Sequence, residues 1–144
     1  MSEKKDTLGK KDALERILSG ERISCKVKTK RGVFIINYPL PRDLRKIEVS
    51  VARMLDGMSE SSFSKQQIAS FRAYATLDEV IVEAPDWWDN LESAEDCPDD
   101  DLITKIYARY LRLYKAVQES ITKSGFNGSS GISKSKNKDE IMAD

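Results

Sequence analysis

The chain has 144 residues, of which 40 % are hydrophobic and 33 % are charged, and this suffices for one domain with a hydrophobic core. It contains no histidine, which excludes Ser-His-Asp, Cys-His and histidine-metal chemistry. Its 24 Lys and Arg balance 24 Asp and Glu, so the net charge of zero gives no overall field toward nucleic acid or anionic membranes.

Residues 1–11 are rich in lysine and nearly free of large apolar side chains, so we expect a flexible basic N-terminus there. Next, Leu14, Ile17 and Leu18 have helical spacing, and Ser19-Gly20 is a stop signal. This pattern predicts a short helix. Because two turns are marginal on their own, that helix needs a surface to pack on.

The apolar period changes to two between Arg22 and Tyr38. Over residues 23–30, apolar and threonine side chains alternate with serine and lysine, and Arg31-Gly32 offers a turn before the apolar run 33–38. The pattern predicts a β-hairpin with one apolar face and one face that carries lysines. Two strands alone are barely stable, so helices must cover the apolar face.

Two long helices are expected after the hairpin. Pro41 suits the first turn of the first helix, and apolar residues at helical spacing continue it to Asp56 before Gly57. The second helix is expected over residues 65–83, because Ser64 and a glutamine three residues later fit a capping box and a proline at position 85 ends the pattern.

An acidic connector follows over residues 86–101. Residues 78–101 hold eleven acids and no base, whereas residues 1–31 hold ten bases and five acids, so the charge is bipolar. Pro98 and three aspartates predict the start of a last helix, whose amphipathic pattern continues to Ile121.

These elements predict an α+β fold in a single domain over residues 12–122. A two-stranded antiparallel β-hairpin packs against three main helices, with a short N-terminal helix before them. Residues 123–144 have the composition of a linker, so a flexible C-terminal tail is expected and the termini are expected to be disordered.

The cysteines and the hydropathy indicate the compartment. Cys25 and Cys97 lie far apart without a C-x-x-C spacing, and no run reaches the roughly 18 to 20 apolar residues that cross a bilayer. The start of the chain also lacks the apolar core of a secretory signal. We therefore expect a soluble protein of a reducing cytoplasm, with no membrane partner.

Three kinds of chemistry are left to weigh. The clustered carboxylates of residues 86–101 suit magnesium binding or glycoside hydrolysis. A solvated acidic loop beside a helix start is the favoured explanation, because the helix dipole alone accounts for acids there. Cys97 lies beside a helix start yet has no partner base, which disfavours catalysis. The lysines of the hairpin suit phosphate contacts, but no aromatic residues or nucleic-acid motif accompany them, so a solvated face is favoured.

The aromatic residues favour binding over chemistry. Tyr107, Tyr110 and Tyr114 lie on one helical face, which is more often core than site. Trp87 and Trp88 differ, because adjacent tryptophans on one connector do not easily both point inward. At least one of them is expected to be partly exposed, as is typical of binding hot spots, although covering the core is an equal alternative.

The order of elements and two segments carry a resemblance to a known family. The segments are Asn37-Tyr-Pro-Leu-Pro-Arg-Asp43, followed by Arg45-Lys-Ile-Glu48, and Ala75-Thr-Leu-Asp-Glu-Val-Ile-Val-Glu-Ala-Pro-Asp-Trp-Trp88. Over residues 22–122 the chain resembles the small tail assembly chaperones of tailed bacteriophages. Other phage structural proteins share this general pattern, and the family has no invariant catalytic signature.

The resemblance implies a non-enzymatic protein of the host cytoplasm, without a cofactor, that binds the helical tape measure protein and helps tail tube proteins assemble. Association with further copies of this chain is left open. The alternatives are a virion component, such as a head-tail connector or tail completion protein, and, less favoured, a nucleic-acid-binding regulator. By side-chain type alone, we expect a partner-binding groove made of Phe71, Tyr74, Trp87, Trp88, Tyr110 and Tyr114.

Overall fold

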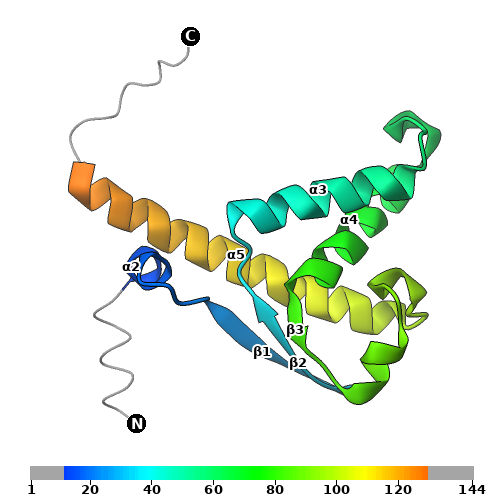
Figure 1. Ribbon diagram of the computed structural model, residues 1–144, viewed down its shortest axis with the longest axis horizontal. Coiled ribbons are helices and arrows are strands. Elements are labelled where there is room, and N and C mark those ends of the chain that lie inside the picture. Colours follow the sequence, from blue (N-terminus) through cyan, green and yellow to red (C-terminus); the bar gives the residue numbers. More distant parts are fainter. Residues whose placement is uncertain (1–11, 130–144) are drawn as a thin grey trace. The chain divides into compact units, whose positions relative to one another are not determined.

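A computed structural model describes residues 12–129, with side chains up to Lys123 (Figure 1). The chain divides into two compact units. One unit is residues 24–114, and the described parts of the other are residues 12–23 and 115–129. The sequence pattern predicts one domain over residues 12–122 instead. The described elements include four helices and an antiparallel sheet, which confirms the α+β class.

The predicted hairpin is present in the larger unit. Strands β1 (Ser24–Thr29) and β2 (Gly32–Asn37) are antiparallel, and Val27 lies opposite Phe34. Both of these side chains are buried, while the lysines of β1 are exposed. Alternation along β1 therefore separates a core face from a solvent face, as its pattern predicts.

A third strand corrects the predicted two-stranded sheet. Helix α4 (Lys65–Val80) ends three residues earlier than expected, and β3 (Ile81–Glu83) pairs antiparallel with β2, giving the order β1-β2-β3. The helix prediction was wrong for residues 81–83. Two β-branched residues, Ile81 and Val82, suit an extended chain, and the free edge of β2 supplies backbone partners that satisfy their polar groups.

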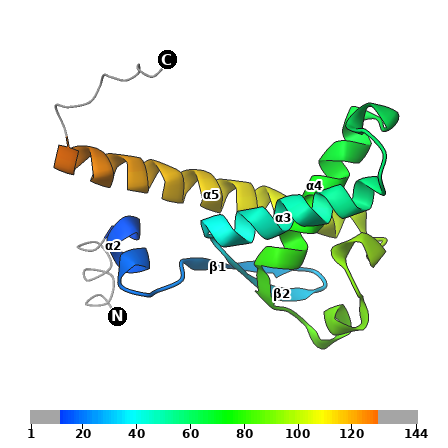
Figure 2. The same ribbon diagram turned by 45° about the horizontal axis from the view of Figure 1, so that its top comes forward.

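Helix α3 (Pro41–Leu55) packs against α4, and the two form a helical hairpin (Figures 1 and 2). Ile47 and Val51 on α3 are buried together with Ala75 on α4. The predicted capping box opens α4, because the Ser64 hydroxyl accepts a hydrogen bond from the Gln67 amide and the Gln67 side chain accepts one from the Ser64 amide. Local capping and apolar spacing thus agree here with the packing.

Short 3₁₀ turns connect the long helices: η1 (Glu60–Ser62), η2 (Asp86–Asn90) and η3 (Ala94–Asp96). The carboxylate of Asp78, near the end of α4, accepts hydrogen bonds from the Ser93 hydroxyl at 2.7 Å and the Ala94 amide at 2.6 Å. These bonds attach η3, within the acidic connector, to the helical hairpin. The connector is therefore ordered although its charge suggests a solvated loop.

Helix α5 (Asp100–Ser129) starts at the predicted aspartates, where Asp99 accepts a hydrogen bond from the Leu102 amide. It continues six residues past Lys123, so the first part of the predicted flexible tail is helical. In the smaller unit, α2 (Ala13–Leu18) is the predicted short helix, and its first amide donates to the Ser120 hydroxyl at 3.4 Å. The predictions for residues 1–11 and 130–144 lie outside the described residues.

Candidate partner-binding site

The two tryptophans cover the end of the hairpin. Both rings meet Phe34 edge to face, with centroids 6.3 Å away for Trp87 and 5.3 Å away for Trp88. The indole N–H of Trp87 donates to the backbone oxygen of Arg31 at 2.9 Å. Both side chains are half-buried. This agrees with the expected partial exposure, yet much of each ring packs inside the fold.

The predicted tyrosine ladder is present, and its middle residue, Tyr110, is buried in the core. Tyr107 stacks with Tyr110 at 5.7 Å, Tyr110 lies 6.0 Å from Tyr114, and Tyr114 stacks with Tyr38 at 5.4 Å. Tyr110 is only 6 % exposed, and burial raises its pKa well above the ordinary value. Tyr110 therefore has too little surface to contact a partner, and its place in the expected groove is a correction.

Phe71 lies in a further aromatic pair. Its ring meets Phe63, just before α4, edge to face at 5.1 Å, and both are half-buried. This contact packs the end of the loop between α3 and α4 against the first part of α4. The six residues expected to form one groove are thus distributed over several separate contacts.

A groove does exist between α4 and α5, with a volume of about 340 Å³. Its residues recur every three or four positions on each helix, so one face of α4 opposes one face of α5. Alanine and serine side chains leave the space open, and two tyrosines border it. The lining residues are Gln66, Ala69, Ser70, Ala73, Tyr74, Asp100, Ile103, Thr104 and Tyr107.

The two ends of the groove differ in charge. The pKa of Tyr74 is raised by burial and also by the nearby acids Asp100 and Glu95. The pKa of Tyr107 is raised by burial, while Arg72 opposes that rise. The Tyr74 end is therefore acidic, and the Tyr107 end lies near a guanidinium.

Only Tyr74 among the expected residues lines this groove. The sequence pattern predicts Tyr107 to be a core residue, whereas the structure places it at the opposite border of the groove. The signal that could have revealed the groove is the set of small residues on α4, since Ala69, Ser70 and Ala73 recur at helical spacing on the face away from Phe71. Small side chains at such spacing allow close approach of another backbone.

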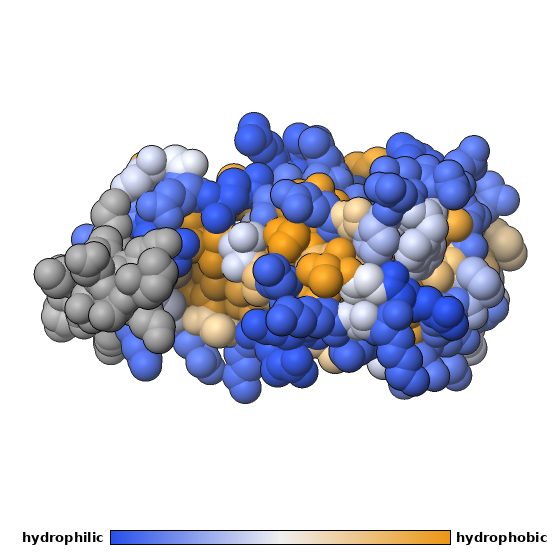
Figure 3. Space-filling model, turned by 90° about the horizontal axis from the view of Figure 1, so that it is seen from below, coloured by the Kyte–Doolittle hydropathy of each residue, from blue (hydrophilic) through white to orange (hydrophobic). Residues whose placement is uncertain are grey.

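Exposed apolar side chains lie elsewhere as well. Val33 of β2 and Val82 of β3 are 45 % and 52 % exposed. The face drawn in Figure 3 shows a patch of hydrophobic residues with hydrophilic residues beside it. Several apolar surfaces are therefore available for contact with another polypeptide.

The described residues bear on two kinds of chemistry, a reactive thiol and a metal site. Burial raises the pKa of the Cys25 thiol, and the nearby Arg109 and Arg112 oppose that rise. Within residues 12–129, no three Cys, Asp or Glu side chains are grouped so that they could hold a metal ion. In the same range, no helix combines the length and the hydropathy needed to cross a membrane.

Comparisons with protein-family models, with curated proteins and with solved structures found no match to this chain.

Proposed function

We propose that this protein is a non-enzymatic tail assembly chaperone of a tailed bacteriophage, which binds the tape measure protein in the host cytoplasm and keeps it soluble while tail tube proteins assemble. The observation that carries the proposal is the groove between α4 and α5. The resemblance over residues 22–122 supplies the identity of the partner.

The groove has the chemistry expected of a site for an amphipathic helix. Its floor of Ala69, Ser70 and Ala73 admits a helix closely, and the rings of Tyr74 and Tyr107 offer apolar contact area with a polar tip at either side. A tape measure protein is long and largely helical, so it exposes apolar stripes that would otherwise aggregate. Covering those stripes requires contact area and no reactive group.

Weak individual contacts suit this role. The groove spans only two to three turns of each helix, so one copy covers a short stretch of a long partner. Many copies along the partner would give a high total affinity, and each copy would still dissociate as the tail tube replaces it.

The test is co-expression with the tape measure protein of the same phage. We expect co-expression to raise the soluble fraction of that protein, and Ala69→Trp, which fills the groove from an exposed position, to abolish the increase. The matched control is Ala52→Trp, because Ala52 is also an exposed helical alanine but lies on α3 outside the groove. Equal solubility with and without the wild-type chain would contradict the proposal.

The alternative function, a structural component of the virion, can be distinguished from a chaperone by experiment. A chaperone is released before the particle is complete, so mass spectrometry of purified particles should not detect this chain. Its presence at a stoichiometry similar to that of known tail proteins would instead assign it to the virion.

A further inference from the structure

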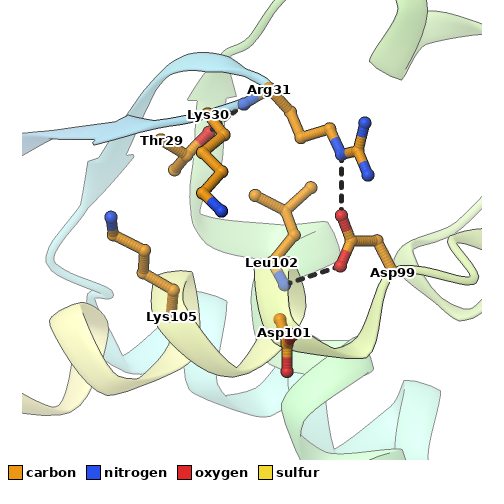
Figure 4. Close-up of a pocket in the computed structure, with 7 residues that line it drawn as sticks. All are labelled: Thr29, Lys30, Arg31, Asp99, Asp101, Leu102 and Lys105. Atoms are coloured by element: carbon orange, nitrogen blue, oxygen red, sulfur yellow. Dashed lines mark hydrogen bonds and ion pairs between the residues drawn. The ribbon is translucent and has the colours of Figure 1, made fainter.

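A second cavity, of about 210 Å³, lies between the turn of the hairpin and the start of α5, and both belong to the larger unit. Figure 4 shows the hairpin above the cavity and α5 below it. Three lining residues come from the hairpin and four from the α5 start. They are Thr29, Lys30, Arg31, Asp99, Asp101, Leu102 and Lys105.

One wall of this cavity is already neutralised. The Arg31 guanidinium donates to the Asp99 carboxylate at 2.8 Å, and the other Asp99 oxygen accepts the Leu102 amide at 3.2 Å. The Arg31 hydrogen bond is the main cause of the lowered pKa of Asp99, so its carboxylate is held in the charged form. This pair therefore fixes the wall and leaves little charge for a ligand.

Two cations face the cavity without such a partner. Lys30 extends from the hairpin toward α5, Lys105 extends from α5 toward the hairpin, and the Asp101 carboxylate points away (Figure 4). Among the described residues, neither lysine makes an ion pair or a side-chain hydrogen bond. Two like charges that converge on one cavity repel each other, and an anion bound between them would relieve that repulsion.

The remaining lining sets the kind of anion. In Figure 4 the Leu102 side chain lies between Lys30 and the Arg31–Asp99 pair. The Thr29 hydroxyl is engaged, because it donates to the Gly32 backbone oxygen at 2.7 Å. The cavity thus offers apolar surface and ammonium groups, with no free hydroxyl. Such a lining suits a hydrocarbon chain that ends in a carboxylate better than it suits a compact, fully hydrated anion.

We propose that this cavity binds a carboxylate carried on a short aliphatic chain, held between Lys30 and Lys105 with its hydrocarbon against Leu102. A free dicarboxylate and a glutamate side chain of a polypeptide share this chemistry. The site uses none of the residues that line the α4–α5 groove, so this proposal can be tested independently of the proposed function.

The experiment is a titration of the full chain followed by two-dimensional amide NMR, with glutarate as the probe at constant ionic strength. We expect saturable shifts at the amides of residues 29–31 and 101–105, with a dissociation constant in the millimolar range. Lys30→Gln combined with Lys105→Gln should weaken binding about tenfold or more, because both charge-assisted contacts are lost. Lys28→Gln is the control, since Lys28 is an exposed lysine of the same hairpin, on β1, outside the cavity.

Two further probes separate the sources and the chemistry. A capped pentapeptide with one central glutamate that binds more tightly than glutarate would assign the site to a polypeptide, and weaker binding of that peptide would assign it to a free dicarboxylate. Inorganic phosphate should bind more weakly than glutarate. The proposal is overturned if glutarate gives no saturable shifts, if the double variant binds like the wild type, or if phosphate binds as well as glutarate.

Discussion

The indole N–H of Trp87 donates a hydrogen bond of 2.9 Å to the backbone oxygen of Arg31, which lies 56 positions earlier in the chain. The same arginine uses its guanidinium to pair with Asp99 at the start of α5. The hairpin turn is therefore held from two sides. A tryptophan that side-chain type suggests for partner binding therefore also positions the turn that borders the cavity of Lys30 and Lys105.

Trp87→Phe should lower the free energy of unfolding by about 1 kcal/mol more than Trp88→Phe does. Both changes keep a ring against Phe34, but only the first removes an indole N–H that donates to the Arg31 oxygen. Urea denaturation of both variants measures the difference. Equal losses would show that this hydrogen bond contributes nothing measurable.

Gly32→Ala should be the more damaging of two matched glycine substitutions. Gly32 has a φ of 130°, and a Cβ at that position would collide with Cγ of Pro85. Gly57 has a φ of 81° and open space around it, so Gly57→Ala introduces backbone strain alone, about 1 to 2 kcal/mol.

We expect Gly32→Ala to cost at least about 1 kcal/mol beyond Gly57→Ala, because overpacking is added to strain. The urea midpoints of the two variants at constant slope give this comparison. If the two variants unfold at the same midpoint, the close approach of Pro85 to the hairpin turn is not maintained in solution.

Local patterns were enough to predict most elements of the fold. The capping box at Ser64 and the aspartates that start α5 are confirmed, because each depends on neighbours in the sequence. The hairpin is present as well, but its turn lies at Lys30-Arg31, one residue before the predicted Arg31-Gly32, because Gly32 already pairs with Thr29. Strand β3 was missed for the opposite reason. Ile81 continues a helical apolar pattern, and the β-branched Ile81 and Val82 form a strand because the edge of β2, far away in sequence, supplies partners.

The candidate site was predictable only in part. Aromatic side chains can be read from a sequence, but whether they bind or fill the core depends on which face each helix presents. Tyr110 turned out to be buried, whereas Tyr74 and the unexpected Tyr107 border a groove. The groove exists because small residues of α4 oppose α5. Which two helices pack together is determined by the tertiary structure and cannot be read from the local sequence pattern.

The ion pair between Glu48 of α3 and Arg72 of α4 should give a salt-dependent and pH-dependent contribution to stability. The hydrogen bonds from Arg72 lower the pKa of Glu48 below its ordinary value. A lowered folded-state pKa means that the contribution is present above the ordinary value near 4.5 and is lost as the pH falls through the lower, folded-state value.

Glu48→Gln should therefore reduce the free energy of unfolding at pH 7 by a few tenths of a kcal/mol up to about 1, since both side chains are largely exposed. The difference from the wild type should shrink in 1 M salt and disappear in strong acid. Denaturation at several pH values and salt concentrations measures both effects. A difference that persists unchanged in strong acid would show that Glu48 acts by packing, not by charge.

Asp78 should show the opposite pH dependence. Burial raises the pKa of its carboxyl, Asp96 raises it further, and the hydrogen bonds from Ala94 and Ser93 only partly oppose this, although part of the residue is exposed. When a carboxyl has a raised pKa in the folded state, its contribution is fully present below the ordinary value near 3.8 and is lost as the pH rises through the folded-state value.

The stability of the wild type relative to Asp78→Asn should therefore fall as the pH rises from below 3.8, because asparagine does not titrate. Ser93→Ala removes one of the hydrogen bonds that favour the carboxylate, so in that background the decline should extend to higher pH. Chemical denaturation of the four combinations across the acid range gives the relevant differences. A relative stability that rises with pH would mean that the bonds to Ser93 and Ala94 outweigh the desolvation of this carboxylate at the join between α4 and the acidic connector.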